Sequence, residues 1–136
     1  MINREKKIKM EEGFREMPYL CSTGHLTSGV GFNLEETPMP EEVADLWLRI
    51  LIDNIIEELA AFEWYAQLNF DRQTVIIDMC YQLGVSGVLK FKRMIAAIES
   101  GDYRLASIEM LASKWAQQTP SRAQRNADAM LMGELV

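Results

Sequence analysis

The sequence predicts an α+β protein that is mainly α, with a small hairpin lobe over residues 12–35 and a larger helical lobe over residues 40–136. Four of the eight glycines lie in the first 31 residues, and none falls between Gly31 and Gly84. A turn-rich opening is therefore followed by a long stretch in which apolar residues recur at helical spacing. With 136 residues, 49% of them apolar, the chain is long enough for a single domain, residues 1–136, with a buried core.

A short helix is expected to precede the hairpin. Residues 3–12 are predicted to be helical, and Gly13 is suited to end that helix because glycine readily takes a positive φ after a helix C-terminus. The stretch "PYLCSTGHLTSGVGF", residues 18–32, is typical of a β-hairpin whose turn is "STG", residues 22–24. The residues that suit strand positions are Leu26, Thr27, Val30 and Phe32.

The helical lobe is predicted to begin at Pro40, which suits the first position of a helix. Apolar residues then follow at helical spacing as far as Phe62, and this pattern fits either one long helix or two shorter ones. Asp71 is expected to cap the next helix, and Gly84 to end it. The residues expected on the inner face of that helix are Val75, Ile76, Met79, Cys80 and Leu83.

Three more helices complete the predicted lobe. The first covers residues 90–99, and the second is capped by Asp102 and runs to about Lys114. The third has Thr119 as its cap and Pro120 in its first position, and it runs to about Met132.

Charge and composition exclude several classes of function. The net charge is −6, and residues 1–88 carry 15 acidic and 7 basic side chains, so nucleic-acid binding is not expected. One histidine and two cysteines give no metal-binding spacing and no disulfide framework, and no cofactor or metal is expected. No segment is apolar enough to insert stably in a membrane, and the N-terminus lacks the apolar core of a signal peptide. The sequence therefore predicts a cytoplasmic location.

The hairpin lobe contains residue types that can catalyse. Glu12 is expected at the C-terminal end of a helix, where the helix dipole disfavours the ionised carboxylate and so favours a general acid. Cys21 and Thr27 can each form hydrogen bonds, and the thiol can ionise. On the residues alone, the commoner interpretation is that the glutamate is solvated and the cysteine is a small buried apolar residue.

Longer motifs change this balance. Glu12, Cys21 and Thr27 are separated by eight and then five residues, and the segments "TSGVGFNL", "CYQLGVSGVLKF" and "SKWAQQTPSRAQR" follow. In these motifs the sequence resembles the tailed-phage lysozymes, glycoside hydrolase family 24, over nearly its whole length. The resemblance implies a lysozyme-like fold with a cleft between the lobes. It also implies cleavage of the β-1,4 bond between N-acetylmuramic acid and N-acetylglucosamine in peptidoglycan.

The resemblance also assigns roles. Glu12 is implied to protonate the leaving oxygen, while Cys21 and Thr27 hold the attacking water. Arg122 matches the arginine beside the catalytic glutamate, although it can equally brace its helix. The residues implied to contact substrate are Asn33, Tyr81, Gln82, Gly84 and Arg122; Gln82 can instead satisfy backbone groups, and Tyr81 can belong to the core. Trp115 is expected in the core and His25 at the surface.

The role of Cys21 remains open at this point. A thiol with an ordinary pKa of about 8.5 is only a few per cent ionised at neutral pH. It can orient water as a neutral group, act as a base in its minor thiolate form, or attack the anomeric carbon. The base or water-orienting role is favoured because the family accepts Asp or Cys at this position.

The sequence departs from the family pattern in three places. Phe32 replaces a histidine, and Met94 and Glu109 stand where relatives often carry small polar or amide residues that contact substrate. The segment after the hairpin is short, so the lobe is expected to lack a third strand. The rival functions are a lytic transglycosylase and a non-catalytic wall-binding relative. The resemblance suggests a monomeric endolysin that acts from the host cytoplasm after a holin opens the inner membrane, with a virion-borne location as the alternative.

Overall fold

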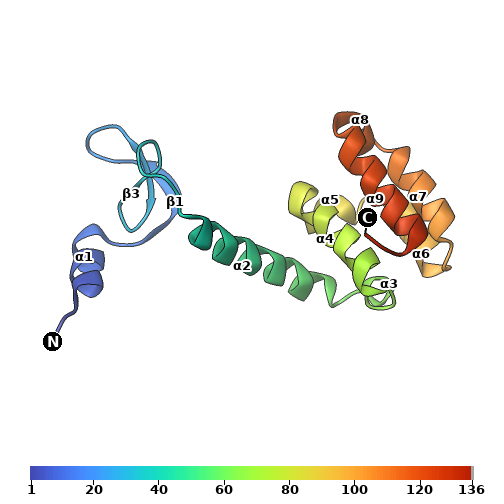
Figure 1. Ribbon diagram of the computed structural model, residues 1–136, viewed down its shortest axis with the longest axis horizontal. Helices are drawn as coiled ribbons and strands as arrows, with labels where there is room; N and C mark the ends of the chain where they lie inside the picture. The colour runs from blue at the N-terminus through green and yellow to red at the C-terminus, as the bar shows by residue number, and fades with distance from the viewer. Residues whose placement is uncertain (136) are drawn as a thin grey trace. The chain divides into compact units, whose positions relative to one another are not determined.

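The computed structural model describes residues 1–135 and contains two compact units. The N-terminal unit, Met1–Asp45, carries the strands, and the C-terminal unit, from Leu46 onward, is helical. Figure 1 labels most of the elements along the chain. The mainly α, lysozyme-like α+β class is confirmed, whereas the cleft between the lobes remains a prediction.

The N-terminal unit begins with α1 (Arg4–Glu12). The Asn3 side chain caps this helix by accepting a hydrogen bond from the Lys6 amide at 2.8 Å. Gly13 ends it with a φ of 73°, as the sequence predicts. All nine residues of α1 are described and none is buried, so neighbouring segments leave its side chains accessible.

A three-stranded antiparallel sheet follows, in the order β1 (Arg15–Leu20), β2 (Leu26–Gly29) and β3 (Phe32–Asn33). The predicted hairpin is confirmed as the β1–β2 pair. The prediction that a third strand is missing is wrong, because β3 pairs with β2 over two residues. Val30 lies in the β2–β3 turn and not in a strand. The glycines on either side of it both have a φ of 63°, which permits the tight reversal.

One helix, α2 (Glu41–Leu59), crosses the boundary between the two units, so the pattern from residue 43 belongs to a single long helix. Phe62 lies outside it and precedes the short α3 (Glu63–Ala66). In α4 (Phe70–Leu83) the cap is Asn69, whose side chain accepts from the Arg72 amide at 2.9 Å. The prediction of Asp71 as cap is therefore wrong by two residues. Asn69 has the extended backbone conformation of a residue that precedes a helix, whereas Asp71 already lies in the first helical turn.

The remaining helices are α5 (Val85–Val88), α6 (Lys92–Glu99), α7 (Tyr103–Leu111), α8 (Lys114–Gln118) and α9 (Pro120–Met132). The short α5 was not predicted, and α6 begins two residues later than expected. The helix predicted to reach Lys114 stops at Leu111, because Ser113 caps a separate α8 through the Ala116 amide. The cap at Asp102 and the start of α9 at Pro120 are confirmed. Thr119 holds the cap position of α9 but makes no side-chain cap bond.

The core lies in the C-terminal unit. The inner face of α4 contributes Val75, Ile76, Met79 and Cys80, all buried as predicted, while Leu83 is partly buried and packs against them. Truncation of a fully buried side chain such as Met79 to alanine costs about 2–5 kcal/mol. Within the described residues, no helix combines the length and apolar character needed to cross a bilayer.

Candidate active site

The turn between β1 and β2 places Cys21 at the beginning of a closed loop. The Cys21 amide donates to the His25 carbonyl at 2.9 Å, and the Gly24 amide donates to the Cys21 carbonyl at 2.9 Å. Gly24 has a φ of 82°, a conformation that a side chain at this position would oppose. The backbone around Cys21 is therefore fixed at both its amide and its carbonyl.

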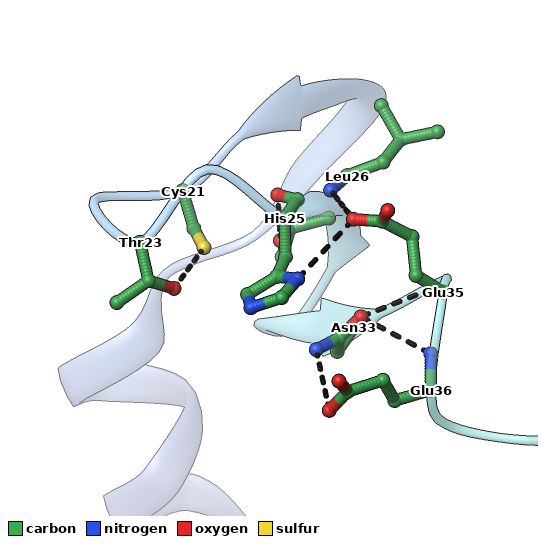
Figure 2. Close-up of polar contacts among 8 residues, drawn as sticks. Cys21, Thr23, His25, Leu26, Asn33, Glu35 and Glu36 are labelled. Carbon is green, nitrogen blue, oxygen red and sulfur yellow. Dashed lines mark hydrogen bonds and ion pairs between the residues drawn. The ribbon is translucent and has the colours of Figure 1, made fainter.

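The Cys21 sulfur meets hydrogen-bond donors in this turn. Its Sγ atom lies 3.1 Å from the Thr23 hydroxyl oxygen (Figure 2). The Thr23 hydroxyl, followed by the backbone of His25 and of Thr23, lowers the pKa of Cys21 to about 6 against a small opposing effect of burial. At neutral pH a group with this pKa is about 90% ionised. Hydrogen bonds within the turn thus favour the thiolate, whereas the sequence alone predicts an ordinary thiol.

Thr27 is held beside this turn. It is buried, at 4% exposure, and it pairs with Tyr19 of β1 and Asn33 of β3 from the central strand. Its hydroxyl donates to the His25 carbonyl at 2.9 Å, the same carbonyl that accepts from the Cys21 amide. The Thr27 hydroxyl has one proton, which it donates to this carbonyl and not to the sulfur. Thr27 therefore contributes least among the groups that lower the Cys21 pKa. The structure thus brings Cys21 and Thr27 together around one carbonyl.

Glu12 is the last residue of α1, and its carboxylate lies against the turn between β2 and β3. A Cβ atom placed on Gly31 would come within 2.6 Å of the Glu12 Oε2 atom. Gly31 also has a φ of 63°, so this position favours glycine for both its backbone and its neighbour. The second glycine of "GVG" thus makes room for the carboxylate.

His25, just before β2, and Glu35, just after β3, form a pair that sequence reasoning did not predict. His25 Nδ1 lies 3.4 Å from the Glu35 carboxylate, which also accepts a hydrogen bond from the Leu26 amide at 2.7 Å. His25 was expected at the surface, and its side chain is partly exposed while it contacts Glu35. Glu35 lies two residues after the end of β3, so its approach to His25 depends on the pairing of β3 with β2, which was not predicted.

Asn33 was expected to contact substrate, and in the structure it forms the turn after β3. Its Oδ1 atom accepts from the Glu35 and Glu36 amides at 3.0 and 3.3 Å, and its Nδ2 atom donates to the Glu36 carboxylate at 3.5 Å. Figure 2 shows this turn beside the His25–Glu35 pair. These bonds occupy the Asn33 side chain within the turn. Contact between Asn33 and substrate remains a prediction.

In the C-terminal unit, Tyr81, Gln82 and Gly84 lie at the end of α4. Tyr81 is exposed, and Gln82 accepts a hydrogen bond from Trp115 Nε1 at 2.9 Å. Trp115 is buried, as predicted for a core residue. Gly84 ends α4 with a φ of 78° and meets no atom that a Cβ would contact, so backbone geometry accounts for this glycine.

Arg122 braces two helices. From α9 its guanidinium donates to both carboxylate oxygens of Asp78 on α4, at 3.0 and 2.6 Å, and Asn126 donates to the same carboxylate at 2.8 Å. Burial acts to raise the pKa of Asp78, but the bonds from Arg122 and Asn126 outweigh it, and the net shift is downward. The bracing role is thus observed, whereas a position beside Glu12 remains a prediction.

A groove of about 630 Å³ lies within the C-terminal unit, between α5, α6, α7 and α8. Leu83, Phe91 and Trp115 give it apolar walls. Its charged lining residues are Lys90, Lys92, Arg93, Lys114 and Glu109, so basic side chains predominate. Met94 and Glu109, two of the departures from the family pattern, both line it. Over the described residues, no cluster of three or more side chains is suited to hold a metal ion.

A short helix, a small antiparallel sheet and a helical unit with this Glu–Cys–Thr arrangement define a lysozyme-like fold. The chain belongs to the phage lysozyme family, whose model matches residues 9–129. The matched range includes Glu12, Cys21, Thr27 and Arg122.

Individual relatives resemble different shares of the chain. The pre-baseplate central spike protein Gp5 of Enterobacteria phage T4 is 27% identical over 163 aligned positions, which cover 98% of this chain and 28% of that protein. Two probable T4-type lysozymes of Dictyostelium discoideum are 38% and 35% identical over 71 residues, 52% of this chain and 42% of each of those proteins. The chain thus spans less than half the length of these relatives. The alignment with the spike protein is longer than this chain, so the spike protein has residues in that region that this chain lacks.

Proposed function

We propose that this protein hydrolyses peptidoglycan at the β-1,4 bond between N-acetylmuramic acid and N-acetylglucosamine. Membership of the phage lysozyme family supports this class of activity. The observation that carries the proposal is the placement of Cys21 and Thr27 around the same His25 carbonyl, at the family's spacing from Glu12. The basic groove of the C-terminal unit supports binding of an anionic wall polymer.

In the proposed reaction Glu12 gives its proton to the leaving glycosidic oxygen as the bond to the anomeric carbon breaks. A water molecule attacks that carbon, and its proton passes to the Cys21 sulfur. The Thr27 hydroxyl oxygen orients the water, because its proton is already donated to His25. This reaction inverts the anomeric configuration, and it needs space for water between acid and base, roughly 6.5–9.5 Å.

The base role for Cys21 has support over the nucleophilic role. Hydrogen bonds from the Thr23 hydroxyl and from backbone groups stabilise the negative charge on sulfur, which weakens its nucleophilicity. A base whose pKa lies near the working pH transfers protons efficiently in both directions. Covalent attack by sulfur would instead retain the configuration.

Product analysis separates hydrolysis from its rivals. Digestion of purified peptidoglycan is expected to give reducing N-acetylmuramic acid ends, as detected by mass spectrometry. A lytic transglycosylase would give anhydro ends, and a non-catalytic wall-binding relative would give no fragments. Glu12→Gln serves as the matched control, because it keeps the size of the side chain and removes the proton donor.

We further propose that the protein acts from the host cytoplasm and reaches the wall once a holin opens the inner membrane. The alternative of a virion-borne enzyme has support in one relative, whose name places it in a pre-baseplate central spike. Immunoblotting of purified virions and of infected-cell cytoplasm before lysis tests the two locations. Detection only in virions would contradict the cytoplasmic proposal.

A further inference from the structure

We propose that Thr23 is a positioning residue for the reaction, whose hydroxyl donates a hydrogen bond to the Cys21 sulfur and so holds it as the proposed base. This inference rests on the proposed function, because it assigns a partner to the proposed base. Neither the family spacing nor the sequence motifs involve Thr23, which lies in the turn between Cys21 and Thr27.

The geometry of the turn supports this role. Thr23 is two residues after Cys21, and the hydrogen bond between the Gly24 amide and the Cys21 carbonyl closes the loop over both of them. Within this loop the Thr23 hydroxyl oxygen lies 3.1 Å from the sulfur. Thr23 is exposed, and sulfur is the hydrogen-bond partner that its side chain has in the structure. The hydroxyl is therefore oriented toward the proposed base.

The same arrangement would also stabilise an aspartate at position 21. An aspartate at the start of such a turn accepts hydrogen bonds from the amide two residues later, as in an Asx-turn. In this structure the Cys21 sulfur lies 3.1 Å from the Thr23 hydroxyl oxygen instead. The turn thus stabilises an anion at this position, whether the anion is a carboxylate or a thiolate.

Charged groups of the N-terminal unit do not account for the ionisation of Cys21. His25 and Glu35 pair with each other, and the Arg15 guanidinium lies 4.3 Å from the centre of the Tyr19 ring. The Glu12 carboxylate lies against Gly31, and a negative charge from α1 would disfavour a thiolate. The groups that lower the Cys21 pKa are hydroxyls and backbone groups, with the Thr23 hydroxyl first among them.

The test compares Thr23→Val, which removes the hydroxyl and keeps the shape, with Thr23→Ser, which keeps the hydroxyl. Ser22→Ala is the matched control, since Ser22 occupies the same turn and is exposed. The first readout is the pH dependence of Cys21 alkylation by iodoacetamide, measured by mass spectrometry at each cysteine. Cys80 does not interfere, because burial raises its pKa to about 12. Circular dichroism verifies that each variant is folded.

Thr23→Val is expected to move the midpoint of Cys21 alkylation by about one pH unit or more toward the ordinary thiol value near 8.5. Thr23→Ser and Ser22→Ala are expected to keep the wild-type midpoint. The second readout is the acid limb of kcat/KM for peptidoglycan hydrolysis, which should move with the alkylation midpoint in Thr23→Val.

An unchanged alkylation midpoint in Thr23→Val overturns the inference whether or not the enzyme is lytic. A shifted midpoint with an unmoved acid limb overturns the role in hydrolysis, because Thr23 would then act on sulfur without affecting the reaction. If wild-type protein releases no fragments, the proposed function fails, and the alkylation series shows separately whether Thr23 holds the thiolate.

Discussion

Replacing Gly31 with alanine is expected to impair catalysis far more than stability. The new Cβ atom would lie 2.6 Å from the Glu12 Oε2 atom, whereas ordinary contact begins at 3.4 Å. The carboxylate must therefore move by about 0.8 Å, the difference between these two distances. It can do so at little cost to the fold, because it is the end of a flexible, exposed side chain. A misplacement of about 1 Å can cost roughly 100-fold in rate, so we expect kcat to fall about 10- to 100-fold.

The matched control is Gly101→Ala. Gly101 has a φ of 74°, close to the 63° of Gly31, but a Cβ added there would meet no atom within 4 Å. Both variants carry the backbone strain of alanine at positive φ, about 1–2 kcal/mol, which urea unfolding measures. Only Gly31→Ala should lose turnover of purified peptidoglycan, as followed by turbidity. If the two variants lose turnover equally, or if neither does, Gly31 does not position the Glu12 carboxylate.

Three further predictions concern individual side chains. Glu12→Gln should lower turnover by at least roughly 10²–10⁴-fold without loss of stability, and turnover near the wild-type rate would remove Glu12 from the mechanism. The acid limb of wild-type kcat/KM should lie near pH 6, with activity lost below it because Cys21 becomes protonated. Cys21→Asp should move this limb to about pH 4, and Cys21→Ala should lose most activity. A fully active alanine variant would show that the thiol only packs against its neighbours. Folding lowers the pKa of Asp78, so its carboxylate stabilises the folded protein at pH values above its unfolded-state pKa near 4. This stabilisation is lost as the pH falls through the lower pKa of the folded state. Asp78→Asn should therefore lower the free energy of unfolding at pH 7 by roughly 1 kcal/mol, allowing for partial exposure, and should make unfolding less dependent on acid pH. Urea titrations at pH 7 and pH 3 measure both effects. An unchanged urea midpoint at pH 7 would contradict this account of the Arg122 brace.

Much of the fold could be predicted because local signals agree with tertiary packing. Gly13 and Gly84 end helices as expected, and α9 begins at Pro120. Errors arose where two residues compete for one role. Asp71 is a good cap by type, but Asn69 precedes it and makes the cap bond. The two-residue strand β3 carries almost no periodicity, so only its pairing with β2 reveals it.

Sequence reasoning placed Cys21 and Thr27 in one hairpin, as the structure shows, but it did not foresee the hydrogen bonds around the sulfur. Family spacing indicated Cys21 and Thr27, but an ordinary thiol was expected. The hydrogen bonds that lower the pKa of Cys21 depend on the geometry of the turn, which residue types do not specify. The His25–Glu35 pair was missed for the same reason, because it requires the register of β3. For Arg122, the sequence left a brace and a site residue equally open, and its two bonds to Asp78 show the brace.

The most direct test of the account is the configuration of the first product released from peptidoglycan, followed by nuclear magnetic resonance before mutarotation. Wild-type protein is predicted to release a reducing N-acetylmuramic acid end as the α anomer, inverted from the β linkage, and Cys21→Asp is predicted to do the same. Glu12→Gln should release nothing. A β anomer from the wild-type protein would show that sulfur attacks the sugar, and an anhydro end would show that no water is activated; either result would contradict the assignment of Cys21 as the base.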